Sequence, residues 1–291
     1  MAEMARPHTA RRTLAALALL AAAVAGLASL GRWQLHRADE RRAVRAAIEA
    51  GRSAPPLALS PGVPAEELRA WRPASAQGAW RNDLTVLVDN RNQDGRPGLW
   101  VATPLEFDQA PGHAVLVLRG WLPRPLDGGP LAVPPGPPGP QQVQGELASR
   151  VPRLFDLATL TGGQPAGLPQ GWPGQPAADA RAGQGARDGV GGEAGPGRGS
   201  GPAGEPPRVQ NLDLDDYARA TGLRMLPAVL EQGGEPGDGM RRDWPQPSVD
   251  ADQNMGYAMQ WFGFAAIAAA AWVAVAARAL RRRRAARAQR D

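Results

Sequence analysis

The chain has 291 residues and a formal net charge of +5, and arginine supplies all 33 of its basic side chains. It contains no cysteine and three histidines, with His8 far from the other two, which excludes disulfides, thiolate sites and a catalytic tri-histidine zinc centre. The arginine excess gathers at the two ends of the chain beside apolar runs, so nucleic acid is not an expected partner.

The first apolar run, 13–30, contains no charge and no proline. As a helix it would rise about 27 Å, which is just enough to cross the hydrocarbon core of a bilayer. The run follows Arg11 and Arg12 and has small residues at 25–28, which also fits a cleaved signal peptide. Taken alone, this segment leaves a membrane anchor and a signal peptide as alternatives.

The second apolar run, 256–277, carries no charge and as a helix would reach about 33 Å. Tyr257, Trp261 and Phe264 follow helical spacing and share one face. The run ends at Arg278 and the arginine block 281–284, which is typical of a cytoplasmic flank. A buried helix of a soluble core would not explain this tail, so the run is predicted to span a membrane.

Basic flanks at both ends predict two crossings, with both termini in the cytoplasm and the centre of the chain outside it. The expected fold class is an α+β membrane protein, in which two transmembrane helices flank a β-rich extracytoplasmic domain with a disordered Gly/Pro-rich insertion. The predicted segments are a cytoplasmic tail at 1–12, a transmembrane helix at 13–30, the periplasmic domain at 31–255, a transmembrane helix at 256–277 and an Arg-rich cytoplasmic tail at 278–291.

Within the domain, hydrophobic patterning predicts a short series of elements. Asp213 as N-cap and Gly222 as stop bound a helix, while Thr103 and Pro104 are expected to end a strand or place it at a sheet edge. In chain order the predictions are a helix at 37–52, strands at 84–89, 99–105, 113–122 and 143–151, a helix at 213–222 and a strand at 226–231.

Two segments interrupt these elements, at 125–140 and at about 161–207. Both are rich in glycine and proline. The longer one cannot bury enough apolar surface to offset the entropy of ordering it, so it is predicted to be a disordered surface insertion.

Several short motifs occur in a fixed order along the chain, and together they resemble the surfeit locus protein 1 family. The resemblance covers 13–160 and 208–278. The motifs are Gly31-Arg32-Trp33-Gln34 with Arg37, Gly98-Leu99-Trp100-Val101-Ala102-Thr103-Pro104-Leu105, Arg119-Gly120-Trp121-Leu122-Pro123, the stretch 211–231, Arg242-Asp243-Trp244-Pro245 and Tyr257-Ala258-Met259-Gln260-Trp261-Phe262.

This resemblance implies a non-enzymatic assembly factor of the bacterial inner membrane. Its expected partners are subunit I of a haem-copper cytochrome c oxidase, other oxidase assembly factors and the lipid bilayer. No cofactor is required, but haem a is a candidate for transient binding, and Tyr257, Trp261 and His36 are the residues expected near it. An axial donor and aromatic walls are what haem binding requires.

The sequence departs from the family at Asn254, where members commonly carry a histidine. Asparagine is a poor ligand for haem iron, which leaves Met255 and His36 as alternative donors. The ordinary roles of these two residues are an interfacial apolar contact and a solvated helix position.

Three residues of the domain motifs are expected to determine the fold. Arg119 can pair with a carboxylate, Trp121 can pack across a strand, and Gly98 is expected to provide a backbone conformation that other residues resist. A membrane-tethered enzyme is disfavoured because no nucleophile elbow, zinc helix motif or nucleotide loop is present. The remaining alternative is a structural membrane scaffold that binds another membrane complex without a cofactor.

Overall fold

The computed structural model describes residues 7–125, 129, 131–154, 168–169, 172–173, 205–234 and 237–288. The chain divides into two units, one formed by Met1–Ala46 with Gln246–Asp291 and the other by Ala47–Pro245. Apart from 168–169, 172–173 and 205–207, the predicted insertion at 161–207 lies outside the described residues.

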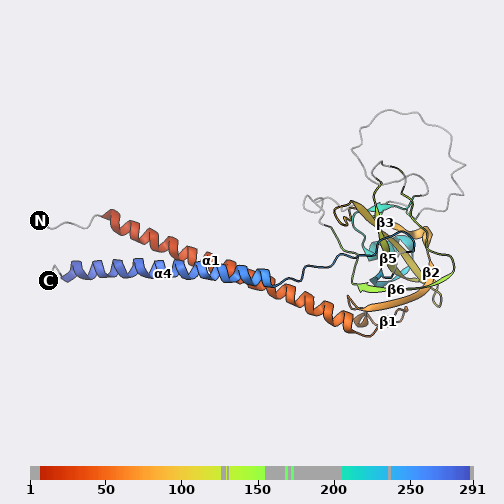
Figure 1. Ribbon diagram of the computed structural model, residues 1–291, viewed down its shortest axis with the longest axis horizontal. Coiled ribbons are helices and arrows are strands. Elements are labelled where there is room, and N and C mark those ends of the chain that lie inside the picture. The colour runs from red at the N-terminus through yellow and green to blue at the C-terminus, as the bar shows by residue number, and fades with distance from the viewer. Residues whose placement is uncertain are drawn as a thin grey trace, which may run out of the picture. The chain divides into compact units, whose positions relative to one another are not determined.

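Two long helices form the first unit: α1, Pro7–Ser53, which continues into the second unit, and α4, Asp252–Ala288. Each contains a stretch long and apolar enough to cross a membrane, and only 6% of that stretch is buried within the protein. A core helix of a soluble domain would be covered by its neighbours, so this exposure fits a membrane protein. Within the unit the helices lie side by side and antiparallel, with the N and C ends of the chain at the same end of the pair (Figure 1).

The second unit is built on an eight-stranded sheet, and its described residues also form the short helix α3 and two single-turn 3-10 helices, Ala65–Glu67 and Asn82–Leu84. Its elements are β1 Leu57–Ala58, β2 Pro73–Trp80, β3 Val86–Val88, β4 Gly98–Phe107, β5 His113–Pro123, β6 Pro140–Ala148, β7 Arg208–Val209, α3 Leu214–Thr221 and β8 Arg224–Gln232. The predicted strands and the helix at 213–222 are confirmed, with bounds shifted by a few residues, and the helix predicted at 37–52 is the last part of the continuous helix α1. β2 has no counterpart among the sequence predictions.

The sheet closes on itself. The neighbours run in the order β1, β2, β6, β8, β5, β4, β3, β7, and β2 also pairs with β4. The strands β2, β6, β8, β5 and β4 therefore form a closed barrel, on which β1, β3 and β7 are short additions (Figure 1). The barrel interior is filled from all five strands, by residues such as Ala76, Phe107, Val117, Leu147 and Leu230.

The prediction that Thr103 and Pro104 end a strand or mark an edge is wrong. Both lie inside β4, between two pairing segments: along β4 the pairing with β3 stops at Ala102, and the pairing with β2 starts at Leu105. The carbonyl of Pro104 accepts a hydrogen bond from the backbone N–H of Arg81. In a strand the nitrogen and carbonyl oxygen of one residue point to the same side, so Pro104 occupies the point of partner exchange, where a missing N–H costs little.

α3 begins and ends where the sequence predicted. The Asp213 carboxylate accepts hydrogen bonds from the backbone N–H groups of Asp215 and Asp216, and Gly222 ends the helix at a φ of 71°. The helix buries Tyr217, whose hydroxyl donates to the carbonyl of Leu84 at 2.5 Å. Burial raises the pKa of Tyr217, so this hydroxyl stays a donor and ties the helix to the barrel.

Candidate functional site

α1 and α4 meet along one stripe of each helix. On both helices the less exposed positions recur at alternating steps of three and four residues, which is the spacing of a coiled-coil seam. They include 13, 17, 20, 24, 27, 31, 34, 38 and 41 on α1, and 254, 258, 261, 265 and 268 on α4, with 251 directly before α4. One face of each helix is therefore occupied by the other helix, and the remaining faces are exposed.

Small residues allow this close approach. Gly31 and Ala38 of α1, and Ala258 and Ala265 of α4, are buried in the seam at intervals of seven residues. The ring of Phe262 lies over Gly31, where an added Cβ would come within 2.8 Å of the ring. In a bilayer, helices associate through such close packing because lipid tails give little hydrophobic driving force.

Two polar contacts, one to α4 and one to the residues directly before it, hold α1 at the end of the seam away from the termini. The side-chain nitrogen of Asn254 donates to Oε1 of Gln34 at 2.7 Å, and Nη1 of Arg41 donates to the carbonyl of Asp250 at 2.6 Å. The Asn254 Oδ1 is buried and has no hydrogen-bond partner among the described residues. Asn254 thus links the two helices, and its amide nitrogen is committed to that link.

The other haem-proximal candidates lie near this polar end. His36 is on α1 with its side chain 75% exposed, and its Nε2 lies 3.3 Å from the Glu40 carboxylate. On α4, Tyr257 is about half exposed, and the ring of Trp261 meets that of Phe264 edge to face at 6.1 Å. Among the described residues, no hydrogen bond or ring contact joins His36 to either aromatic residue.

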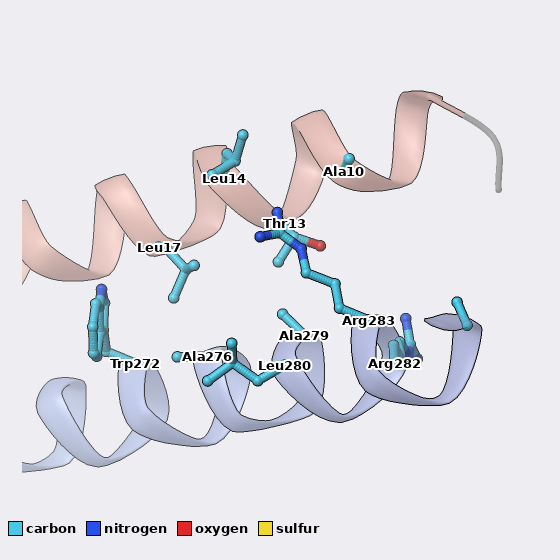
Figure 2. A pocket seen from close by; sticks show the side chains of 11 residues that line it. Ala10, Thr13, Leu14, Leu17, Trp272, Ala276, Ala279, Leu280, Arg282 and Arg283 are labelled. Atoms are coloured by element: carbon cyan, nitrogen blue, oxygen red, sulfur yellow. The ribbon is translucent and has the colours of Figure 1, made fainter. Parts of the chain in front are cut away.

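At the opposite end, beside the termini, the two helices enclose an apolar pocket of about 420 Å³. Leu17 of α1 points toward α4 and Trp272 of α4 toward α1, and Leu14 and Leu280 also line the pocket (Figure 2). Arg282 and Arg283 also line the pocket, and Figure 2 shows the side chain of Arg283 extending toward Thr13. Nothing in the alanine-rich sequence of the two runs indicated this pocket.

In the barrel, Arg119 is the extra residue of a β-bulge. Val101 lies opposite Gly120 and Ala102 opposite Leu118, so Arg119 has no partner on β4. Its side chain is only 2% exposed. It donates to the carbonyl of Pro134 at 2.7 Å, lies 3.8 Å from the Asp238 carboxylate and stacks on the Trp80 ring at 5.2 Å. Burial lowers the pKa of Arg119, although the negative charge of Asp238 opposes this effect.

The tryptophans of three motifs come together in one cluster. Trp100 lies opposite Trp121 across β4 and β5, and the rings of Trp100 and Trp244 meet edge to face at 5.6 Å. The indole N–H of Trp121 donates to the carbonyl of Arg91, whose guanidinium lies 4.5 Å from the Trp100 ring. These motif residues therefore hold the outer layer of the domain together, which confirms cross-strand packing for Trp121.

Gly98 is required for space, which differs from the expected role in backbone conformation. Its φ is not in the left-handed region, and an added Cβ would lie 2.3 Å from the Trp121 ring. The tryptophan of one motif thus packs directly on the glycine of another, and any side chain at this position would displace the ring.

Glu231 of β8 is a titratable residue that the sequence analysis did not identify. It is 8% exposed, and burial raises its pKa from 4.5 to about 7, with a further contribution from Glu146 on the adjacent strand. The raised pKa means that the native state binds a proton more readily than the unfolded chain. The stabilisation is fully present below about pH 4.5 and is lost as the pH rises through 7.

We therefore expect Glu231→Gln to be more stable than the wild type at pH 8 by up to about 3 kcal/mol, and nearly equal to it near pH 4.5. Urea unfolding of the detergent-solubilised protein at several pH values measures this difference. The matched control is Glu66→Gln at an exposed position, which should leave the pH profile unchanged. A Glu231→Gln variant whose stability parallels that of the wild type from pH 4.5 to 8 would contradict the raised pKa.

The sequence matches the model of a known family. A family model for the SURF1 family aligns with residues 21–266, which includes most of α1, the whole barrel domain and the beginning of α4. A search of curated proteins finds no match to this chain. Because the family match covers most of the chain, including the polar end of the helix seam and the tryptophan motifs, the chain belongs to the SURF1 family.

Proposed function

We propose that this protein is an inner-membrane assembly factor for a haem-copper cytochrome c oxidase and assists the maturation of subunit I. The SURF1 family is linked to cytochrome oxidase assembly and is not known for an enzymatic activity. The observation that carries the proposal is the span of the family match, which takes in parts of both apolar helices together with the domain between them. The proposed role therefore belongs to the whole protein, with its domain and both membrane helices together.

The distribution of charge supports an orientation with both termini in the cytoplasm and the barrel in the periplasm. Arg11 and Arg12 precede the apolar part of α1, and Arg278 and the block 281–284 follow that of α4. Positive charge beside membrane spans favours the cytoplasmic side. Since the helices are antiparallel, the proposed orientation has the arginine-rich end in the cytoplasm and the end with Gln34 and Asn254 toward the periplasm.

A surface for subunit I is available on α4. Tyr257, Met259, Phe264 and Ile267 are 46%, 70%, 53% and 68% exposed, respectively. They lie outside the seam with α1, so helix pairing does not cover them. Apolar side chains that face away from the partner helix are available to pack on another membrane protein. A transient contact of this kind suits an assembly factor.

The residues at the polar end allow haem a to bind through His36. An exposed imidazole is accessible from the side of the helix, and a carboxylate beside one ring nitrogen is the usual means of orienting a histidine ligand. With Nε2 beside Glu40, Nδ1 would be the iron donor. His36 lies midway between the seam positions 34 and 38, on the outer face of α1, so a haem held there would not share a face with Tyr257 and Trp261 of α4. Asn254 does not fit as a ligand, because its amide nitrogen is bonded to Gln34. A bound haem a would supply redox chemistry, and the residues of this chain would only hold and orient it.

Co-expression with the enzymes of haem a synthesis tests this assignment. The purified wild type is expected to show a haem a absorption spectrum, His36→Ala to lose about nine-tenths of it, and Asn254→His to gain a second donor and retain more haem. In a deletion strain, the haem a absorbance of the oxidase should fall and be restored by the wild-type gene. Normal oxidase spectra without this protein would refute the assembly role. Full rescue by chains that never carry haem would instead support a cofactor-free scaffold.

A further inference from the structure

The pocket beside the chain termini has the walls of a lipid site. Leu17 and Trp272 face each other across it, and Ala276 and Ala279 leave the space between the helices open (Figure 2). The lining residues fall between 10 and 17 and between 272 and 286, outside the 21–266 matched by the family model. The pocket is therefore separate from the residues used for the proposed oxidase role.

A gap of this kind is not left empty in a membrane. Side chains that line a void lose dispersion contacts on one side. An acyl chain from the surrounding lipid can fill the void and restore these contacts. The pocket volume of about 420 Å³ and its apolar lining suit a flexible hydrocarbon chain. The walls alone, however, would accept a lipid of any headgroup.

The charge at the rim selects the headgroup. Arg282 and Arg283 line the pocket, and Arg11, Arg12 and Arg278 are on the same end of the helix pair. The described segments 7–38 and 253–288 contain no aspartate or glutamate. These described segments therefore supply no carboxylate to pair with the arginine cluster. A guanidinium presents a planar fork of donors that matches the oxygens of a phosphate.

We propose that this pocket binds one anionic phospholipid from the cytoplasmic leaflet. The phosphate contacts Arg282 and Arg283, and an acyl chain lies between Leu17 and Trp272. Basic pockets between transmembrane helices at this depth attract anionic lipid headgroups. The inference rests on the helix pair crossing the membrane with its arginines inside, and it does not depend on the oxidase role.

The fluorescence of Trp272 reports on this site in proteoliposomes. The full-length protein is placed in phosphatidylcholine vesicles with a small fraction of brominated phosphatidylglycerol, or the same fraction of brominated phosphatidylcholine. The part of the quenching that is lost in Trp272→Phe belongs to the pocket, since the chain has 9 tryptophans. Each of the two arginine contacts is expected to raise the affinity for the anionic lipid roughly fivefold, so the wild type should prefer it over phosphatidylcholine by about 25-fold.

Matched double variants separate a site from diffuse charge attraction. The double variant Arg282→Gln with Arg283→Gln should reduce the preference for the anionic lipid to near unity. The double variant Arg281→Gln with Arg284→Gln removes the same charge from residues that do not line the pocket, and it should keep most of that preference. Ala276→Phe fills the cavity with the arginines intact and should remove Trp272 quenching by either lipid. An equal fall in both double variants, or no preference in the wild type, overturns the proposal. Quenching by neither lipid would overturn both the site and the membrane insertion of this end.

Discussion

Gly78→Ala is expected to destabilise the domain by about 3 kcal/mol or more, because the added methyl group would collide with a neighbouring strand. Its Cβ would lie 2.1 Å from the carbonyl oxygen of Glu106. Gly78 pairs with Phe107 of β4 and with Gln141 of β6 at the same time. β2 therefore cannot move away from one neighbour without distorting its pairing with the other, and the barrel would open between β2 and β4.

Urea unfolding of the full-length protein in detergent, followed by tryptophan fluorescence, measures the loss. Gly62→Ala is the matched control, since a Cβ there meets nothing within 4 Å and the backbone is not left-handed. It should be neutral or slightly stabilising. Gly145→Ala repeats the test on β6, where the added Cβ would lie 2.0 Å from the carbonyl oxygen of Glu231. Equal unfolding midpoints for Gly78→Ala and Gly62→Ala would argue against the closed barrel.

The importance of Gly78 also explains why β2 was not predicted. The inward positions of this strand are small, with Ala74 and Ala76 in the barrel core, and alanine and glycine carry little strand propensity. β4 and β5 were predicted because their valine and leucine runs are buried on both faces. In β2 the small residues are selected by the space between strands. That space exists only in the closed barrel, so a reading of local propensity could not find it.

Pro104 was misassigned for a related reason. The rule that proline avoids central strands concerns the missing donor, and it does not apply where a strand changes partners. Whether such an exchange occurs depends on which segments pair over long sequence distances, here β2 and β3 with β4. The helix caps of α3 were predictable because the bonds of Asp213 reach only to residues two and three positions along.

In the helix pair, too, the features set by neighbouring residues were predictable, and those set by contacts between distant residues were not. The apolar length of both helices was evident from the sequence, but the seam was not, because alanine occupies so many positions that its seven-residue spacing is hidden. The contact of Asn254 with Gln34 joins residues 220 positions apart. Sequence comparison presented Asn254 as a lost ligand position, whereas the structure gives its side chain a definite partner on α1. Amide pairs that join two helices in this way set the register of the pair.

Arg119→Met should cost about 3 kcal/mol in the free energy of unfolding, since it removes a buried cation from an arrangement built around its charge. The Asp238 carboxylate lies between Arg119 and Arg242, at 3.8 Å from Nη2 of the first and 2.7 Å from Nη2 of the second. Nε of Arg242 also donates to the carbonyl of Arg119 at 3.0 Å. The bulge, the carboxylate and both arginines therefore form one unit that joins β5 to the segment entering the Trp244 motif.

Arg119→Lys keeps the charge but loses the planar donors that reach the carbonyl of Pro134 and stack on Trp80, so it should recover only part of the loss. The matched control is Arg219→Met, which removes an arginine that is 75% exposed and paired with Asp216 on the same helix; it should cost less than about 1 kcal/mol. In a double-mutant cycle with Asp238→Asn, the two losses should fall short of additivity, because each substitution disrupts the same cluster. If Arg119→Met unfolds at the same urea concentration as Arg219→Met, the buried cluster does not hold this part of the barrel, and the bulge must be maintained by strand pairing alone.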